Sequence, residues 1–359
     1  MALFKNLFKK NPVTQAPTHV VGIDFGSASV KVVELEQRES MVALKTYGEL
    51  QLGPYANKEL GAIASPTLEQ RIEALVDVMR EAKVTGESGV LALPLTGSFI
   101  TIVSIQAEAG EDIASRVPVE ARKFIPVPMT EISLDWTELP PFENTPANVR
   151  EVLLAAVQNV SNKEMHELLA AVEMASQPTE IEVFSAIRAC AIHDAETTAV
   201  IDLGAQTSKL YITHEGMLRK MHRVFAGGAQ ATSQLANLLT ISHEEAENTK
   251  RNYTSDGENA AEIKKVVVTT FERSFQEFKR VLVQFEARTG LTIDRVVLTG
   301  GSAAFPEIQA YANYMLDYKT ERINSFTKVA YPAFLEDTLE HIAPTFTVAL
   351  GAALRGFDN

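Results

Sequence analysis

Residues 20–35 read VVGIDFGSASVKVVEL. Two runs of β-branched and other apolar residues flank a short turn of glycine, serine and alanine, a pattern that predicts a strand, a tight turn and a second strand. Gly26 lets the backbone approach an anion closely, and Lys31 adds a positive charge, so the turn can cradle a phosphate. Asp24 would then hold Mg2+ through water, because Mg2+ keeps most of its hydration shell. An ordinary hairpin with a polar tip is the alternative for this segment taken alone.

The segment has a second copy in the other half of the chain. Residues 199–212 read AVIDLGAQTSKLYI. Both copies have the order strand, Asp, apolar residue, Gly, two residues, hydroxyl residue, one residue, Lys and strand, so Asp202 matches Asp24 and Lys209 matches Lys31. A hairpin repeated in each half indicates two similar lobes that face one ligand from opposite sides.

The composition limits the class of protein. With 359 residues, of which 46% are hydrophobic, the chain should form more than one domain or a pair of lobes. Asp and Glu outnumber Lys and Arg by 46 to 33, which disfavours nucleic-acid binding. The single cysteine, Cys190, lies in an apolar stretch and is predicted to be buried, which fits a reducing compartment. No apolar run approaches the ~20 residues that a transmembrane helix needs.

The two hairpins resemble the phosphate-1 and phosphate-2 loops of the actin, Hsp70 and sugar-kinase ATPase superfamily. The first hairpin is similar in amino-acid sequence to that of the PilM family of type IV pilus assembly proteins. The second, DLGA at residues 202–205, departs from the GGGT form of Hsp70-like loops, and this departure is itself typical of the PilM family. The resemblance covers residues 20–357 and implies an α/β, actin-like (Hsp70/FtsA-type) two-lobed ATPase fold with an inserted small α/β subdomain.

The resemblance also implies the cofactors, ATP and Mg2+, and a set of residues that bind them. Asp24 and Asp202 would contact the metal through water. The nucleotide-binding set comprises Gly26, Ser27, Ala28, Ser29 and Lys31 of the first hairpin, Gly204, Ala205, Gln206 and Thr207 of the second, and Gly227, Gly228, Glu247, Lys250, Gly300, Gly301 and Ser302 beyond them.

The last part of this set lies at three places after the second hairpin. Gly227 and Gly228 open a predicted helix at 229–239, where backbone amides favour anions. Glu247 and Lys250 stand at i and i+3 on a helix predicted from the capping box of Ser242 and Glu245, and similar pairs flank adenine and ribose in Hsp70 and FtsA; a plain surface ion pair is the alternative. Residues 294–302, DRVVLTGGS, resemble the adenosine motif, a strand that ends in two glycines.

Glu182 is the catalytic candidate, also by resemblance. It begins a predicted helix at the return into the first lobe, and bacterial actin relatives use an acidic residue there to position the attacking water. The alternative is an acid that is favoured at a helix N-terminus by the helix dipole.

The order of motifs predicts how the chain is divided. The first lobe takes residues 19–97, 179–198 and 344–359, and the inserted subdomain takes 98–178. The second lobe takes 199–228 and 294–343, with a further subdomain at 229–293 and an N-terminal tail at 1–18. Within these parts we expect helices at 111–124, 162–176, 266–288 and 344–354, and strands at 99–105, 131–139 and 150–158.

The resemblance implies a mechanical role with at most slow ATP hydrolysis. PilM-like proteins are cytoplasmic, peripheral to the inner membrane, and bind the N-terminal cytoplasmic tail of the membrane protein PilN; other pilus motor components are further candidate partners. Residues 1–10, MALFKNLFKK, form a short basic amphipathic pattern that could aid membrane association, or a frayed tail. An FtsA-like filament protein, a component of a related pilus or secretion system, and a small-molecule kinase are the alternative functions.

Overall fold

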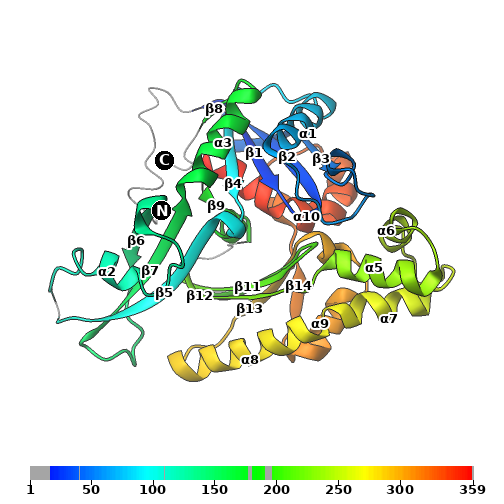
Figure 1. Ribbon diagram of the computed structural model, residues 1–359. Helices are drawn as coiled ribbons and strands as arrows, with labels where there is room; N and C mark the ends of the chain where they lie inside the picture. The colour runs from blue at the N-terminus through cyan, green and yellow to red at the C-terminus, as the bar shows by residue number, and fades with distance from the viewer. Residues whose placement is uncertain (1–16, 40, 109, 177–179, 191–195, 358–359) are drawn as a thin grey trace.

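A computed structural model of the chain describes residues 17–39, 41–108, 110–176, 180–190 and 196–357 (Figure 1). The amphipathic pattern at residues 1–10 therefore lies outside the described residues. The fold contains three sheets. The six-stranded sheet and the five-stranded sheet each contain one of the two repeated hairpins. None of the described helices is both long and apolar enough to span a membrane.

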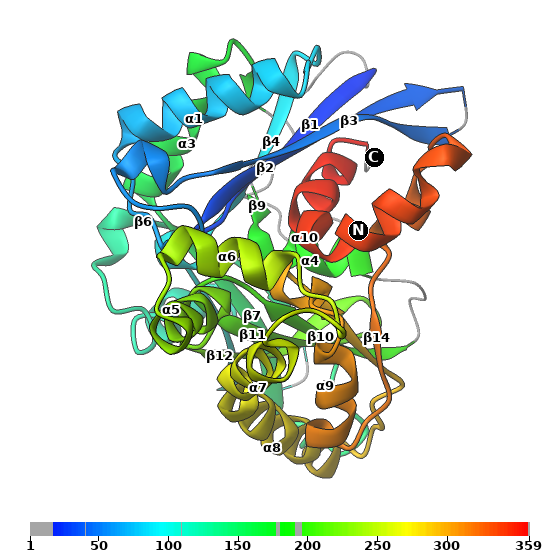
Figure 2. The ribbon, with the colours of Figure 1, turned by 90° about the vertical axis from the view of Figure 1, so that its right-hand side faces the viewer.

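The first lobe is built on a six-stranded sheet with the strand order β3-β2-β1-β4-β8 and β9 paired to β4. β1 and β2 pair antiparallel with Asp24 opposite Lys31, and β4 runs parallel to β1. The strands are β1 (His19–Phe25), β2 (Ser29–Arg38), β3 (Met41–Gln51), β4 (Ser88–Leu93), β8 (Ala175–Ser176) and β9 (Glu180–Ile181). The helices α1 (Leu68–Glu81) and α3 (Asn159–Ala171) cover one face, and α10 (Glu336–Arg355) with α4 (Glu182–Cys190) lies on the other (Figure 2).

The second lobe repeats this plan with a five-stranded sheet of order β12-β11-β10-β13-β14. Asp202 of β10 lies opposite Lys209 of β11, and β13 runs parallel to β10. The strands are β10 (Thr197–Leu203), β11 (Ser208–His214), β12 (Met217–Val224), β13 (Arg295–Thr299) and β14 (Thr320–Arg322). The helices of this lobe are α5 (Gly228–Leu239), α6 (His243–Arg251), α7 (Ala260–Thr270), α8 (Glu272–Thr289) and α9 (Ile308–Leu316). The predicted repeat of a strand hairpin in each lobe is thereby confirmed.

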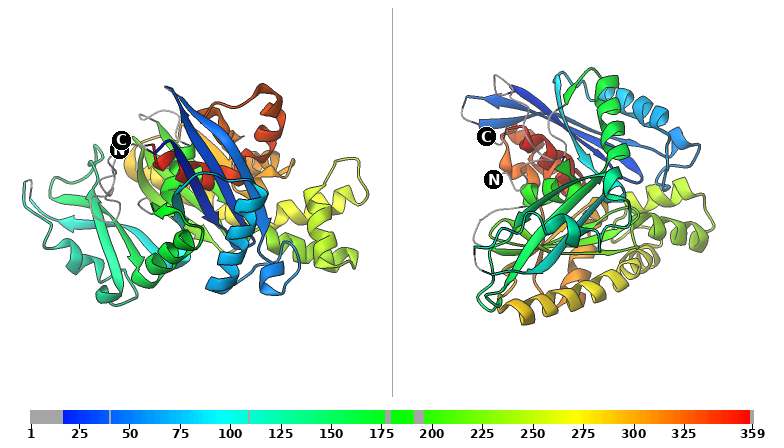
Figure 3. Two further views of the ribbon diagram at one scale, coloured as in Figure 1. Left: turned by 90° about the horizontal axis from the view of Figure 1, so that it is seen from above. Right: turned by 60° about the vertical axis from the view of Figure 1, so that its left-hand side comes forward.

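The inserted subdomain is a three-stranded antiparallel sheet of order β5-β7-β6 with one short helix. Its elements are β5 (Ser98–Gln106), α2 (Val117–Ala121), β6 (Ile132–Glu138) and β7 (Val149–Gln158). It stands out to one side of the two lobes (Figure 3) and has a hydrophobic cluster of its own. Phe142, in its β6–β7 loop, packs into the core of the second lobe beside Phe285.

Helix α10 passes close to both β1 and α4, and two glycines make this possible. A Cβ added to Gly22 would lie 1.9 Å from the carbonyl oxygen of Ala349. A Cβ added to Gly351 would lie 1.9 Å from the carbonyl oxygen of Ser185. No side chain fits at such separations, so these glycines set the distance between the helix and the rest of the first lobe.

Four of the predicted helices differ from the structure. The helix predicted at 162–176 is α3, which begins at Asn159 and ends at Ala171, and residues 175–176 form β8 instead. The helix predicted at 266–288 is divided into α7 and α8, because the chain turns at Phe271 and so places this fully buried ring in the core; no glycine or proline marks the break. The helix predicted at 111–124 is shortened to α2, which begins one residue before Pro118, as a ring without an amide hydrogen favours the first turn.

The final helix begins eight residues earlier than predicted. The prediction placed its start at Pro344, but α10 begins at Glu336 and contains Pro344. A proline inside a helix frees the carbonyl four residues back, here that of the exposed Glu340. The carbonyl of Pro344 itself accepts hydrogen bonds from Gly300 N–H at 2.9 Å and from the hydroxyl of Thr299 at 3.1 Å, which ties α10 to the second lobe.

Candidate functional site

The two repeated hairpins bring four charged side chains together with Glu182 at the start of α4. Lys209 Nζ lies 3.0 Å from Asp202 Oδ2 and 2.9 Å from Glu182 Oε2. Glu182 also accepts a hydrogen bond from Leu95 N–H at 3.0 Å, which fixes its carboxylate between the lobes. In the first hairpin, Lys31 Nζ lies 3.9 Å from Asp24 Oδ2. These five side chains come from segments that lie up to 185 residues apart in sequence, and the Glu182 and Asp202 carboxylates are close enough to Asp24 to affect its pKa.

The electrostatics of this cluster favour a bound cation. Burial, together with the neighbouring Glu182 and Asp202 carboxylates, raises the pKa of Asp24 to about 6 against the opposing effects of Lys31 and Lys209. Burial also disfavours the charged form of Lys209, but the Asp202 and Glu182 carboxylates outweigh this and hold the pKa of Lys209 well above its ordinary value. Asp24 is therefore a carboxylate whose negative charge lacks full compensation from the protein alone.

The turns of the two hairpins are closed by equivalent backbone hydrogen bonds. Gly26 N–H donates to the carbonyl of Ser29 at 2.9 Å, and Gly204 N–H donates to the carbonyl of Thr207 at 3.0 Å. Residues 24–31 and 202–209 are all described, and none of them has a positive φ. Ala205 therefore occupies the second turn without backbone strain, although Hsp70-like loops carry glycine there.

The N-terminus of α5 packs directly against the second turn. Gly228 N–H donates to the carbonyl of Gly204 at 3.0 Å, and Ala229 N–H donates to the carbonyl of Ala205 at 2.9 Å. The expectation that these amides are free for an anion is therefore wrong. The glycines instead permit the close packing, since a Cβ on Gly227 would lie 2.4 Å from the carbonyl oxygen of Ala205.

Glu247 and Lys250 form a largely buried pair on α6, at the place where the turn at Gly61 of the first lobe lies against Glu247. Lys250 Nζ lies 2.6 Å from Glu247 Oε2, 2.6 Å from the hydroxyl of Thr232 and 3.1 Å from the carbonyl oxygen of Gly228. Burial alone would raise the pKa of Glu247, but Lys250 and the hydrogen bonds lower it to about 2. The alternative of a plain surface ion pair is thus excluded, and the predicted capping box of Ser242 and Glu245 at the start of α6 is confirmed.

The glycine pair after β13 leaves room beside the second turn. Gly300 has φ +87°, and a Cβ there would lie 2.4 Å from Asp202 Oδ1. A Cβ on Gly301 would meet no atom within 4 Å, so its backbone is open on that side. Ser302 Oγ lies 3.5 Å from the carbonyl oxygen of Gly204. The adenosine motif therefore lies against the same turn as the second phosphate loop.

Two charged residues beside the site escaped the sequence analysis. Glu49 lies opposite Lys31 in the β2–β3 register, and Arg251 approaches it from the second lobe with 3.6 Å between its Nη1 and Glu49 Oε2. A single Glu near the end of a strand gives no signal of its own, because its partner depends on strand register and lobe packing. Arg251 could have been found, since it stands at i+4 from Glu247 and binds it at 2.8 Å.

The residues present fit a nucleotide with Mg2+. The chain offers two turns, two lysines, the open backbone at Gly301 and the incompletely compensated Asp24 carboxylate. Among the described residues, no three His, Cys, Asp or Glu side chains are grouped so as to ligate a metal directly. Such a site suits a metal that contacts the protein through its water shell and is otherwise held by phosphate oxygens.

Comparisons with known proteins agree with this description. The family model described as type IV pilus assembly protein PilM matches residues 22–357. A solved structure of a PilM-PilN type IV pilus biogenesis complex has a TM-score of 0.78 at 22% identity, with 95% of this chain and 99% of that chain covered. The ethanolamine utilization protein EutJ from Carboxydothermus hydrogenoformans has a TM-score of 0.56 at 17% identity, with 98% and 94% covered.

A third solved structure is more distant. MreB 5 of Spiroplasma citri, bound to AMPPNP, has a TM-score of 0.51 at 12% identity, with 96% of each chain covered. At these identities the likenesses show the fold, and the predicted actin-like α/β fold with two lobes is confirmed by them.

Proposed function

Because the chain belongs to the PilM family of type IV pilus assembly proteins, we propose that it is an actin-like, ATP-binding component of a pilus assembly platform. In this role it binds MgATP between its lobes and docks the N-terminal cytoplasmic tail of a PilN-like protein. The observation that carries the nucleotide half is the cluster of Asp24, Lys31, Glu182, Asp202 and Lys209 at the meeting point of the two hairpins.

The nucleotide is held by the residues that line the two turns and the glycine pair. Lys31 and Lys209 supply positive charge for the phosphates, and Gly301 leaves space for the ribose and base against its backbone. Asp24 and Asp202 would hold Mg2+ through its bound water, and the metal would neutralise phosphate charge there. Glu247 and Lys250 border the base end, where Lys250 is held by the Gly228 carbonyl and Thr232.

Glu182 orients a water molecule for slow hydrolysis in this proposal. Its carboxylate is fixed by Leu95 N–H and by Lys209, so it has one defined position between the lobes. A carboxylate paired with Lys209 is a weak base, and its contribution is therefore positioning rather than strong proton abstraction. This fits a protein whose nucleotide state matters more than its turnover.

In this proposal the PilN-like tail docks between the first lobe and the inserted subdomain. Support for the partner comes from family membership and from the solved PilM-PilN complex, whose chain is covered to 99%. A protein with this partner is expected to be peripheral to the cytoplasmic face of the inner membrane, held there by the tail and aided by residues 1–10.

The test is a calorimetric titration of a synthetic peptide with the sequence of the PilN-like tail from the same cell. Saturable binding with a stoichiometry near one is the expected result, and a scrambled peptide serves as the control. Absence of heat and of any chemical-shift change at saturating peptide, with and without MgATP, would refute the docking role. The titration is repeated with MgATP to find out whether the two sites are coupled.

A further inference from the structure

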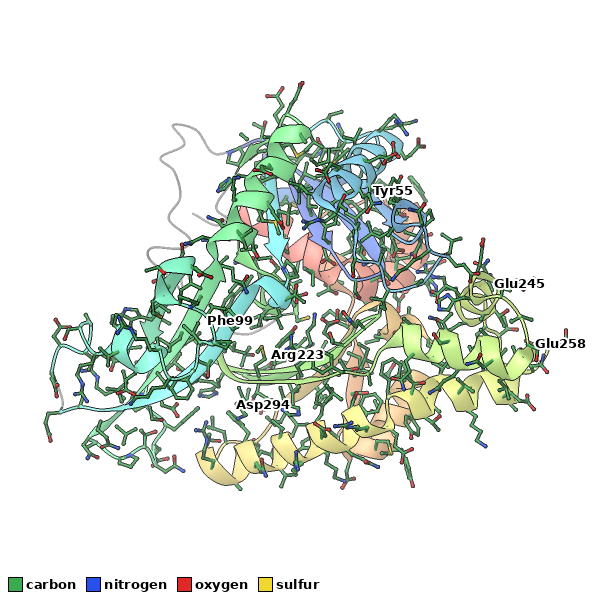
Figure 4. All side chains as sticks on the ribbon, viewed as in Figure 1. Tyr55, Phe99, Arg223, Glu245, Glu258 and Asp294 are labelled. Carbon is green, nitrogen blue, oxygen red and sulfur yellow. The ribbon has the colours of Figure 1, made fainter. Side chains whose placement is uncertain are left out.

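The two lobes also contact each other at a place that is distant in sequence from the segments that connect them. The segment after β3 in the first lobe meets α6 of the second lobe, and Figure 4 labels Tyr55 and Glu245 on the two sides of this contact. Glu59 Oε2 accepts a hydrogen bond from Glu244 N–H at 3.3 Å. The ring of His243 lies with Nδ1 3.1 Å from the carbonyl oxygen of Leu60.

A glycine allows the first lobe to lie against Glu247, which borders the base end of the proposed nucleotide site together with Lys250. Gly61 has φ +76°, and a Cβ there would lie 2.5 Å from Glu247 Cγ. Gly61 N–H also donates to Gln51 Oε1 at 3.3 Å, which ties this turn to the end of β3. The backbone of the first lobe therefore lies directly on the carboxylate that holds Lys250 in the second lobe.

A chain of charges runs across the same contact. Glu49 of β3 lies opposite Lys31 of the first hairpin and 3.6 Å from Arg251 of α6. Arg251 Nε donates to Glu247 at 2.8 Å, and Glu247 holds Lys250 at 2.6 Å. Burial would raise the pKa of Glu49, but Lys31, Arg251 and a hydrogen bond with Ser29 together lower it, so this carboxylate stays charged. The chain joins the first phosphate turn to the base end.

We infer that Glu49 is a positioning residue of the nucleotide site and that Glu49, Arg251 and the Leu60–Gly61 turn together form an interlobe latch. This latch sets the rate at which nucleotide dissociates. The inference rests on the proposed nucleotide binding. In this inference the Leu60–Gly61 turn, which lies on Glu247, moves away before a nucleotide between the lobes leaves, so the latch opens first. Glu49 holds both Arg251 and the first phosphate turn, so loss of nucleotide and opening are linked.

The first test is stopped-flow measurement of a fluorescent ATP analogue with Mg2+. An ion pair with one half-exposed partner contributes at most about 1 kcal/mol, so Arg251→Ala is expected to raise the dissociation rate about fivefold with little change in association. Glu49→Gln, which keeps a hydrogen-bonding group near Ser29, should act similarly. The double variant should be no faster than Arg251→Ala alone, because Arg251→Ala already removes the pair with Glu49 together with the pair with Glu247.

Two matched controls separate the latch from general loss of charge. Glu36→Ala removes a carboxylate of the same hairpin that lies 3.8 Å from Lys45, away from α6. Arg273→Ala removes an i,i+4 pair with Glu277 on α8, as Arg251→Ala does on α6. Both should leave dissociation unchanged. Equal dissociation rates in Arg251→Ala, Glu49→Gln and wild type would overturn the latch.

The second test needs no nucleotide and so separates failure of the latch from failure of the proposed function. Spin labels at Glu73→Cys on α1 and Asn248→Cys on α6 report the distance between the lobes, since both positions are exposed and Cys190 is buried. Arg251→Ala should broaden the distance distribution and move it to longer values. An unchanged distribution would refute the latch, whereas a broadened one together with no nucleotide binding would refute the proposed function alone.

Discussion

Lys209 is the residue whose removal tests the site most severely without any ligand. Its ammonium group is the common partner of Asp202, at 3.0 Å, and Glu182, at 2.9 Å, and all three side chains are about nine-tenths buried. The substitution Lys209→Ala leaves two carboxylates facing each other inside the protein. Removal of one partner from a buried pair typically costs about 3 to 5 kcal/mol, because the remaining charge is uncompensated.

The pH dependence of this loss follows from the chemistry of the carboxylates. The variant can neutralise one of the two carboxylates by binding a proton. For a carboxyl of ordinary pKa about 3.9, the free energy of this protonation is about 4 kcal/mol at pH 7 but only about 1.5 kcal/mol at pH 5. The carboxyl pKa in the folded variant is then raised above its unfolded value. The folded variant binds more protons than its unfolded chain, so its stability falls as pH rises between about 4 and 7.

Urea unfolding of Lys209→Ala and wild type at pH 5 and pH 7 measures both values. We expect a loss of free energy of unfolding of about 4 kcal/mol at pH 7 and less than half of this at pH 5. Lys163→Ala, which removes an exposed partner of Glu167 on α3, is the control and should cost less than about 0.5 kcal/mol at either pH. A loss for Lys209→Ala below 1 kcal/mol, or one equal at the two pH values, would refute the buried charge cluster.

Three further predictions concern nucleotide, catalysis and packing. The pKa of Asp24, about 6, predicts that MgATP affinity measured by calorimetry falls about tenfold from pH 7 to pH 5. The affinity of Asp24→Asn should depend less on pH, and a wild-type affinity that rises toward pH 5 would contradict this prediction. Glu182→Gln should slow single-turnover hydrolysis about 100-fold and leave MgATP affinity within threefold, and equal hydrolysis rates would exclude a water-positioning role. Gly351→Val forces a side chain against the Ser185 carbonyl and should lower the free energy of unfolding by about 3 kcal/mol in urea titrations; an unchanged midpoint would rule out the close approach of α10 and α4.

The two hairpins and their charged residues Asp24, Lys31, Asp202 and Lys209 could be predicted from the sequence, because the motif occurs twice with the same spacing and each copy supports the interpretation of the other. Local signals also predicted the capped helix α6. The break at Phe271 was missed, since a buried aromatic ring redirects the chain there while the apolar periodicity continues across it. The apolar periodicity identifies which residues are apolar, but it does not give the position of the core around which the chain must turn.

The electrostatic detail of the site could not be read from sequence for a related reason. The partners of Lys209 come from α4 and β10, and those of Arg251 come from β3 and α6, so each depends on how the lobes pack. The amides of Gly228 and Ala229 were expected to be free, yet the preceding turn uses them. A motif gives the residue types of a site, whereas tertiary packing decides which groups remain available to a ligand.

Binding of MgATP to wild type, Asp24→Ala and Glu36→Ala, compared by calorimetry at pH 7.5, tests the central claim most directly. Asp24 belongs to the charge cluster between the lobes, whereas Glu36 lies on the same hairpin beside Lys45. The account predicts saturable, Mg-dependent binding with one site in wild type and Glu36→Ala, and loss of Mg-dependent binding in Asp24→Ala. Equal affinity in all three proteins, or no binding to wild type, would contradict it.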